Sequence, residues 1–306
     1  MSFSRCWIRW GGAAAVAAVA AAGCNDAPDD EMPDVDAPAE MPFDEDEAGD
    51  VQGVVLYEGD PPEPDPLDMA SEPDCQAHWE EQGITPHRDL VRLSEDGELS
   101  NVFIYVREGL EGMEFPIPGE ASLIDQVGCR FTPSVASVQA GQQMVFRNSD
   151  GLLHNINATP QDNRPFNISQ PVNMDSERVF AQPEVMIPIR CDVHGWMRGY
   201  VGVVSHPYHA VSADDGGFDL STLPPGDYVI EAWHSELGVL EESVTVETGE
   251  VAEVTFTFEE GMLATANPPM ADPIDPHDHH HPLDVRAMRN GAHGDHDHHA
   301  GPVARH

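Results

Sequence analysis

Three residues with metal-binding side chains stand at close, regular spacing in the segment "PIRCDVHGWMRGYVGVV": Cys191, His194 and Met197. A thiolate, an imidazole nitrogen and a weak thioether belong to the ligand set of blue copper sites, which also needs a second histidine. His154 can supply it, because it lies just past a predicted strand in "MVFRNSDGLLHNINATP". The separation of 37 residues from His154 to Cys191 leaves room for strands that bring the two loops together. These four residues predict one mononuclear copper site.

The segments around these residues resemble the cupredoxin family. "FRNSDGLLHN" followed by "CDVHGWMRGYVGVV" matches the family's two ligand loops, and the Cys-x2-His-x2-Met loop is similar to that of its amicyanin-like members. The resemblance extends over "DQVGCRFTPSVASVQAGQQMVFRN" and covers roughly residues 117–206. It implies a Greek-key sandwich with a type 1 copper, in which His154, Cys191 and His194 are equatorial ligands and Met197 is axial.

The resemblance also assigns neighbouring residues. Asn155 matches a position whose side chain ties the two ligand loops together, and His194 matches the ligand nearest solvent, through which electrons would leave. Two positions depart from the family pattern: Asp192 stands where Ser or Thr is usual, and Gly195 where the amicyanin-like loop has proline. An acid next to the ligand cysteine would lower the copper potential, so Asp192 joins Asn155 as a residue expected to act on the ligands.

The cysteine usage points to export. Residues 1–23 have a basic head and a short alanine-rich apolar run, the pattern of a signal peptide. They end in "VAAAGC", which resembles the lipobox of bacterial lipoproteins, so Cys24 is expected to carry a lipid anchor; plain secretion is the alternative. In an oxidising compartment Cys75 and Cys129 are the natural disulfide pair, which leaves Cys191 as the free thiol. Periplasm or cell surface is the expected location, with Asn25 favouring the outer membrane.

The charge excludes one class of partner. The formal net charge is −41, and all 14 basic residues are arginines. So acidic a chain is not expected to bind nucleic acid through phosphates. A basic redox protein, such as a c-type cytochrome or a periplasmic dehydrogenase, remains compatible. The sequence contains no hydrolytic triad or phosphate-binding loop, and we expect an electron carrier or metal-binding protein, not an enzyme.

The chain divides into several segments by composition. Short β-rich runs separated by Gly, Pro and Asp predict an all-β fold, with one short helix around "DCQAHWEEQG". The segment beginning "DDGGFDLSTLPPGDYVIEAW" resembles the carboxypeptidase regulatory-like, transthyretin-type β-sandwich, a structural module. The expected segments are a signal peptide (1–23), a lipidated acidic linker (24–50), a β-subdomain or cap (51–116), a cupredoxin domain (117–206), the transthyretin-like sandwich (207–260) and a disordered His-rich tail (261–306). The first strand of 51–116 could instead join the sheet of the last sandwich.

Other histidines are weaker candidates. Cys75 and His78 repeat the Cys-x2-His spacing without a methionine, His206 and His209 are expected at the surface, and His234 in a packing role. The tail can be read as a weak metal-binding region or as a solvated run. Its candidate ligands are His277, His279, His280, His281, His293, His296, His298 and His299. A copper-trafficking lipoprotein that uses this tail, and a surface scaffold, are therefore the alternatives to electron transfer.

Overall fold

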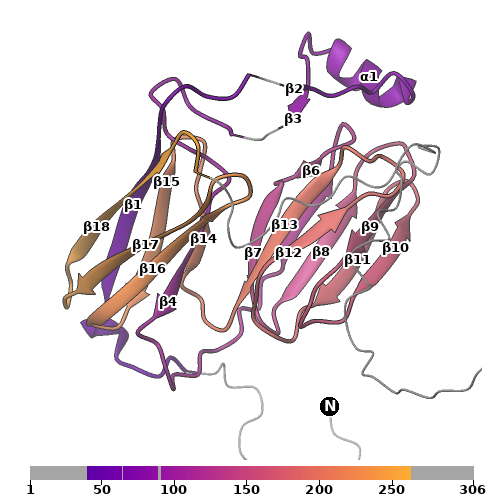
Figure 1. Cartoon of the computed structure of the whole chain (residues 1–306). Coiled ribbons are helices and arrows are strands. Elements are labelled where there is room, and N and C mark those ends of the chain that lie inside the picture. The colour runs from indigo at the N-terminus through magenta and orange to yellow at the C-terminus, as the bar shows by residue number, and fades with distance from the viewer. Residues whose placement is uncertain (1–39, 64, 89–90, 263–306) are drawn as a thin grey trace, which may run out of the picture. The chain divides into compact units, whose positions relative to one another are not determined.

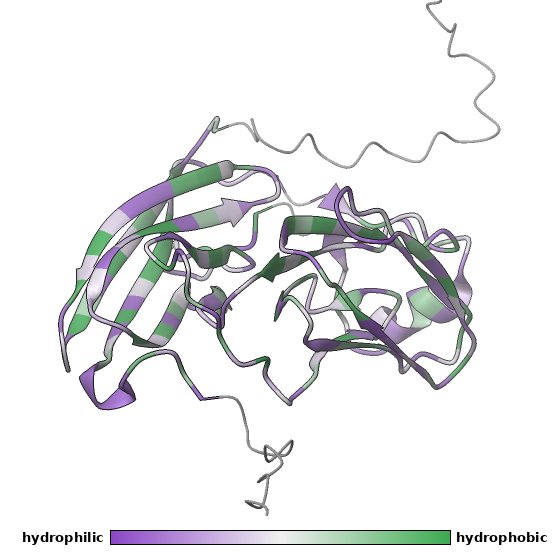
Figure 2. Cartoon of the chain, turned by 90° about the horizontal axis from the view of Figure 1, so that it is seen from below, coloured by the Kyte–Doolittle hydropathy of each residue, from purple (hydrophilic) through white to green (hydrophobic). Residues whose placement is uncertain are grey.

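The computed structural model describes residues 40–63, 65–88 and 91–262, and these form an all-β protein with one α-helix (Figure 1). The expected fold class is confirmed. Alternating polar and apolar residues run along many strands (Figure 2), the pattern of strands with one buried face. In the described part of the chain, no helix is long and apolar enough to span a membrane. Cys24, the signal peptide and the tail histidines lie outside the described residues.

The first β-sandwich, here called the ligand sandwich, consists of two sheets around one core. Its five-stranded sheet has the order β10 (Phe166–Gln170), β9 (His154–Ala158), β12 (Glu184–Arg190), β13 (Arg198–Val204) and β7 (Val135–Gln139). Its four-stranded sheet has the order β11 (Met174–Val179), β8 (Gln143–Asn148), β5 (Ser122–Gln126) and β6 (Phe131–Thr132). Fully buried side chains from both sheets, among them Ile124, Phe146, Ile156 and Ile187, form the core between them. Burial of these apolar surfaces is the main force that holds the two sheets together.

The second β-sandwich is assembled from both ends of the described chain. One sheet has the order β15 (Gly217–Leu223), β1 (Gly49–Glu58) and β18 (Val251–Glu259), and the other has β14 (His209–Val211), β4 (Phe103–Glu108), β16 (Gly226–His234) and β17 (Gly238–Val246). β1 pairs in parallel with β18 from Asp50 opposite Val251 to Glu58 opposite Glu259. Residues 51–116 therefore do not form a separate subdomain, because two of their strands belong to the second sandwich.

A short segment between β1 and β4 carries the only described α-helix. This cap segment, residues 65–88, contains β2 (Asp65–Pro66), α1 (Pro73–Glu80) and β3 (His87–Arg88); a 3-10 helix, η1 (Glu45–Glu47), precedes β1. Pro73 opens α1, where a missing N–H costs the helix nothing. Cys75 on α1 is joined to Cys129 of the ligand sandwich by a disulfide with Cα atoms 5.6 Å apart. Met69 and Cys75 are buried in the core of the ligand sandwich, so the cap segment packs on it.

Candidate metal centre

Strand pairing brings the two ligand segments together. β9 begins at His154, and Cys191 follows the last residue of β12. The two strands are antiparallel, with Arg190 opposite Asn157. The residues that follow Arg190 therefore lie opposite the first residues of β9. This places Cys191 and Asp192 beside Asn155 and His154.

Three donor atoms meet at this place. The Nδ1 atoms of His154 and His194 are 2.8 Å apart, and the Sγ of Cys191 lies 3.9 Å from the first and 3.8 Å from the second. The structure leaves His154 fully buried and Cys191 and His194 only 1 % exposed. Nitrogen and thiolate ligands bind a metal ion at about 2.0–2.3 Å, so atoms this close can share one ion. One soft thiolate with two imidazoles suits copper best among common metals.

The loop from Cys191 to Met197 is closed by its own backbone. The N–H of Cys191 donates to the carbonyl of Met197 at 3.1 Å, and the N–H of Met197 donates to the carbonyl of His194 at 2.9 Å. Met197 is buried in the same core cluster as Cys191. The loop is thus a compact turn between β12 and β13, and it keeps the predicted axial ligand on the inside of the sandwich.

Cys191 is the only free cysteine among the described residues. Burial by itself raises the pKa of its thiol, but hydrogen bonds with His154 and His194 and with the backbone N–H groups of Asn155 and His194 lower that pKa to about 6. The thiolate, which is the form that binds metal, is therefore the stable form at neutral pH. Two further groups of close donors contain Cys129, bonded to Cys75, and a disulfide sulfur is not a thiolate ligand.

Asn155 and Asp192 link the two ligand segments. The Oδ1 of Asn155 accepts the backbone N–H of Asp192 at 2.6 Å. The carboxylate of Asp192 accepts hydrogen bonds from the amides of Asn155, Asn157 and Asn167 at 2.8–3.0 Å and from the guanidinium of Arg190 at 3.0 Å. Burial opposes ionisation of Asp192, but these donors hold its pKa below the usual range. The charge of Asp192 thus points into a cluster of donors beside the ligands.

The cap segment covers the second histidine. A ring nitrogen of His194 and the sulfurs of Cys75 and Cys129 lie within 4.8 Å of one another, and His194 is 1 % exposed. Its exposure does not set His194 apart from the other candidate ligands, since Cys191 and Met197 are also 1 % exposed and His154 is 0 % exposed. The disulfide of the cap lies against this histidine.

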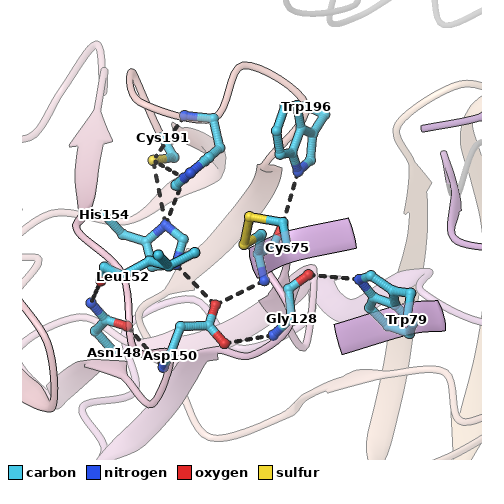
Figure 3. Close-up of a disulfide and its surroundings, with 11 residues drawn as sticks. Cys75, Trp79, Gly128, Asn148, Asp150, Leu152, His154, Cys191 and Trp196 are labelled. Atoms are coloured by element: carbon cyan, nitrogen blue, oxygen red, sulfur yellow. Dashed lines mark hydrogen bonds and ion pairs between the residues drawn. A yellow bond between two sulfur atoms is a disulfide. The ribbon is translucent and has the colours of Figure 1, made fainter. Parts of the chain in front are cut away.

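Trp196 is the aromatic neighbour of His194 toward the surface. Its ring centroid lies 5.3 Å from that of His194, and its indole N–H donates to the carbonyl of Cys129 at 3.0 Å. On the cap, the indole of Trp79 donates to the carbonyl of Gly128 at 2.8 Å. Figure 3 shows the indole of Trp196 beside the disulfide and that of Trp79 at Gly128. Trp196 is half-buried, so it reaches both the ligand and the surface.

The remaining candidate histidines lie away from the three donors. His206 is buried, not at the surface as expected, and binds the carbonyl of Val106 at 2.8 Å; His209 is half-buried in β14. Burial lowers the pKa of both imidazoles to about 4. His234 is buried, and its Nδ1 accepts backbone N–H groups of the following turn. His78 lies against Gly128. A β-carbon added to Gly128 would come within 2.5 Å of the imidazole ring of His78.

Asp150 also belongs to this site, although the sequence motifs assign it no role. Its Oδ2 lies 2.9 Å from the Nε2 of His154, the ring nitrogen that faces away from the other donors. Burial alone would lower the pKa of His154, but the bonds to Asp150 and Cys191 raise it to about 9. The signal in the sequence was the short spacing from Asp150 to His154 in "SDGLLHN", which alone does not distinguish a turn residue from a partner.

No protein-family model and no curated protein matches the chain. Solved structures match part of it. They include a copper-containing nitrite reductase from Thermus scotoductus SA-01, with 20 % identity, covering 32 % of this chain and 25 % of that chain at a TM-score of 0.27. A purple cupredoxin from Nitrosopumilus maritimus has 21 % identity, covering 27 % of this chain and 98 % of that chain at 0.24. A Cu(I) amicyanin variant has 17 % identity, covering 28 % and 85 % at 0.25.

The chain thus spans only a quarter of the nitrite reductase and most of the two smaller proteins. The sandwich itself is cupredoxin-like: two sheets enclose one core, one histidine begins a strand, and a single loop carries the cysteine, the second histidine and the methionine.

Proposed function

We propose that this protein is a blue copper protein that carries single electrons. The observation that supports the proposal most directly is the meeting of one free, buried thiolate with two imidazole nitrogens within 3.9 Å. His154, Cys191 and His194 would hold the ion, with Met197 as a weak axial ligand. When bound, copper would supply a one-electron couple between Cu(I) and Cu(II).

The protein's contribution would be a rigid set of ligands. His154 is fixed by β9 and Asp150, and Cys191 is fixed by backbone N–H groups at its sulfur. The network of Asn155 and Asp192 joins the segments that carry them. Donors that cannot move apart favour electron transfer, because little reorganisation accompanies a change of oxidation state. Trp196 would be the exit for the electron toward a partner, since it contacts the buried His194 and reaches the surface.

We also propose a redox partner and a location in the cell. A basic redox protein, such as a c-type cytochrome or a dehydrogenase, would complement the acidic chain. The lipobox-like segment ending at Cys24 supports a lipid anchor at the periplasmic or outer face of a bacterial membrane. Labelling of the expressed protein with a radioactive fatty acid, with Cys24→Ala as the control, tests the anchor.

The test of the copper site is spectroscopic. Full-length protein loaded with Cu(II) should show an intense thiolate-to-copper band in the visible range and a narrow copper hyperfine splitting. Both should vanish in Cys191→Ala and persist in a variant that lacks residues 263–306. A colourless copper signal that survives Cys191→Ala but not the tail deletion would refute the proposal.

The burial of His194 favours a second candidate, a protein that holds or delivers copper. An enclosed ligand retains its metal well but restricts contact with a redox partner. Two rates separate the candidates. An electron carrier exchanges electrons with a small inorganic complex much faster than it loses copper to a chelator, whereas a delivery protein transfers the metal itself to an acceptor.

A further inference from the structure

Asp150 contacts the first histidine ligand from outside the group of donors. Figure 3 shows its carboxylate between His154 and Gly128. We infer that Asp150 is a positioning residue for copper: it orients the His154 ring, keeps a proton on Nε2 and so presents the Nδ1 lone pair to the metal. The inference deepens the proposed function and rests on it, since the metal is the copper proposed there.

The carboxylate of Asp150 is held by a backbone site built for an anion. Its Oδ1 accepts the N–H of Gly128 at 2.7 Å, and its Oδ2 accepts the N–H of Cys129 at 2.8 Å. Both residues have left-handed φ angles, 60° and 57°, and their two successive N–H groups point to the two oxygens of one carboxylate. Such concave backbone arrangements bind anions. Here the anion is a side chain of the protein.

The turn that carries Asp150 is also fixed. Asn148 is buried, and its Oδ1 accepts the backbone N–H of Asp150 at 3.0 Å. Its amide nitrogen donates to the carbonyls of Leu152 and Gln170 at 2.9 Å each. The carboxylate therefore reaches His154 from a rigid turn on one side and a disulfide-bonded loop on the other.

The geometry decides which ring nitrogen is available. A carboxylate can only accept, so the Nε2 of His154, 2.9 Å from Oδ2, must be the donor. The other nitrogen, Nδ1, faces His194 Nδ1 and Cys191 Sγ. Carboxylate–histidine–metal arrangements fix the tautomer and raise the basicity of the ligand, and loss of such a partner typically costs about 10–100-fold in metal affinity.

The experiment compares Asp150→Ala with Asp125→Ala. Asp125 accepts the hydroxyl of Ser149, next to Asp150, and the backbone N–H of Gln126, and its bonds involve none of the proposed ligands. Both variants lose one negative charge near the same turn. Asp150→Ala removes both carboxylate oxygens, so the Nε2–H of His154 loses its acceptor. Cu(II) affinity, measured by chelator competition, should fall about 10–100-fold in Asp150→Ala and stay within about threefold in Asp125→Ala.

A second measurement needs no copper. In the metal-free protein, the Nε2 proton of His154 should give a low-field NMR signal that exchanges slowly with water. The signal should be lost in Asp150→Ala and kept in Asp125→Ala. Equal copper affinities of the two variants, or a protected proton in Asp150→Ala, would overturn the inference. If the wild type forms no blue site but the NMR result holds, the proposed function fails and the hydrogen bond from His154 to Asp150 stands.

Discussion

The side-chain oxygen of Asn155 accepts the backbone N–H of Asp192 at 2.6 Å, which joins the strand that carries one histidine to the loop that carries the cysteine. The same asparagine donates to the Asp192 carboxylate at 3.0 Å. One side chain thus makes two bonds between segments that are 37 residues apart in the chain. The relative position of His154 and Cys191 depends on this pair.

Replacing Asn155 by alanine should therefore weaken copper binding. We expect a loss of about 10–100-fold in affinity, as for other residues that orient metal ligands. Asn157→Ala is the matched control, because Asn157 contacts only the carboxylate of Asp192 and not its backbone. Chelator competition measures both. Similar losses in the two variants would show that the amide cluster, and not the bond to the Asp192 backbone, holds the loops together.

The sequence predicted that the donors of His154, Cys191 and His194 lie together, and there is a physical reason for this. Cys191, His194 and Met197 lie in one tight loop, so their spacing in the sequence alone keeps their side chains close together. The antiparallel pairing that brings His154 to this loop follows from strand patterns. Asn155 was assigned by resemblance, and the structure places it between the loops. Asp150 was missed because its role depends on the loop at Gly128, whose position is fixed by distant contacts.

Long-range packing also explains what the sequence did not settle. The pairing of β1 with β18 joins strands about two hundred residues apart. From the sequence alone, either strand could bury its apolar face by pairing with a different strand. The burial of His194 depends on the cap segment, which the sequence marks only by a short helix and a cysteine. A ligand's exposure is set by whatever packs on its loop, so resemblance of the loop alone does not predict it.

Charges at Asp192 and Arg190 should shift the copper potential in opposite directions. Cu(II) carries one more positive charge than Cu(I), so Asp192→Asn should raise the reduction potential and Arg190→Gln should lower it. Both side chains are more than a third exposed, so solvent screens them. Each shift should stay below about tenfold in the Cu(I)/Cu(II) ratio, or about 59 mV for one electron. Redox titration of the visible band measures this, and shifts of the same sign would contradict it.

The metal-free site should titrate as an ion pair. Burial opposes charge on both groups, but their mutual hydrogen bond and other partners lower the pKa of Cys191 to about 6 and raise that of His154 to about 9. The thiolate's contribution to stability is fully present above its ordinary pKa of 9.0 and is lost as the pH falls through 6. The imidazolium's contribution is fully present below pH 6.5 and is lost as the pH rises through 9.

Ultraviolet thiolate absorbance of the metal-free protein should therefore show a step centred near pH 6. Cys191→Ala provides the baseline, since no other described cysteine is free. His154→Gln removes the cationic partner and should move the step to higher pH. A wild-type midpoint at the ordinary thiol value of 9.0 would show that the imidazoles do not stabilise the thiolate.

Removing the disulfide should both destabilise the protein and uncover His194. Cys75 and Cys129 are 54 residues apart, and closing a loop of that size contributes roughly 4 kcal/mol in the chain-entropy model. In Cys75→Ala/Cys129→Ala the cap segment keeps only its non-covalent contacts, such as the bond from Trp79 to Gly128. Electron exchange with a small cationic complex should become faster, because the complex can approach the ligand directly. Gln76→Ala, which loses only an exposed bond to Glu80 on α1, should leave the rate unchanged. A less stable double variant with an unchanged rate would show that the cap supports the fold without limiting access to His194.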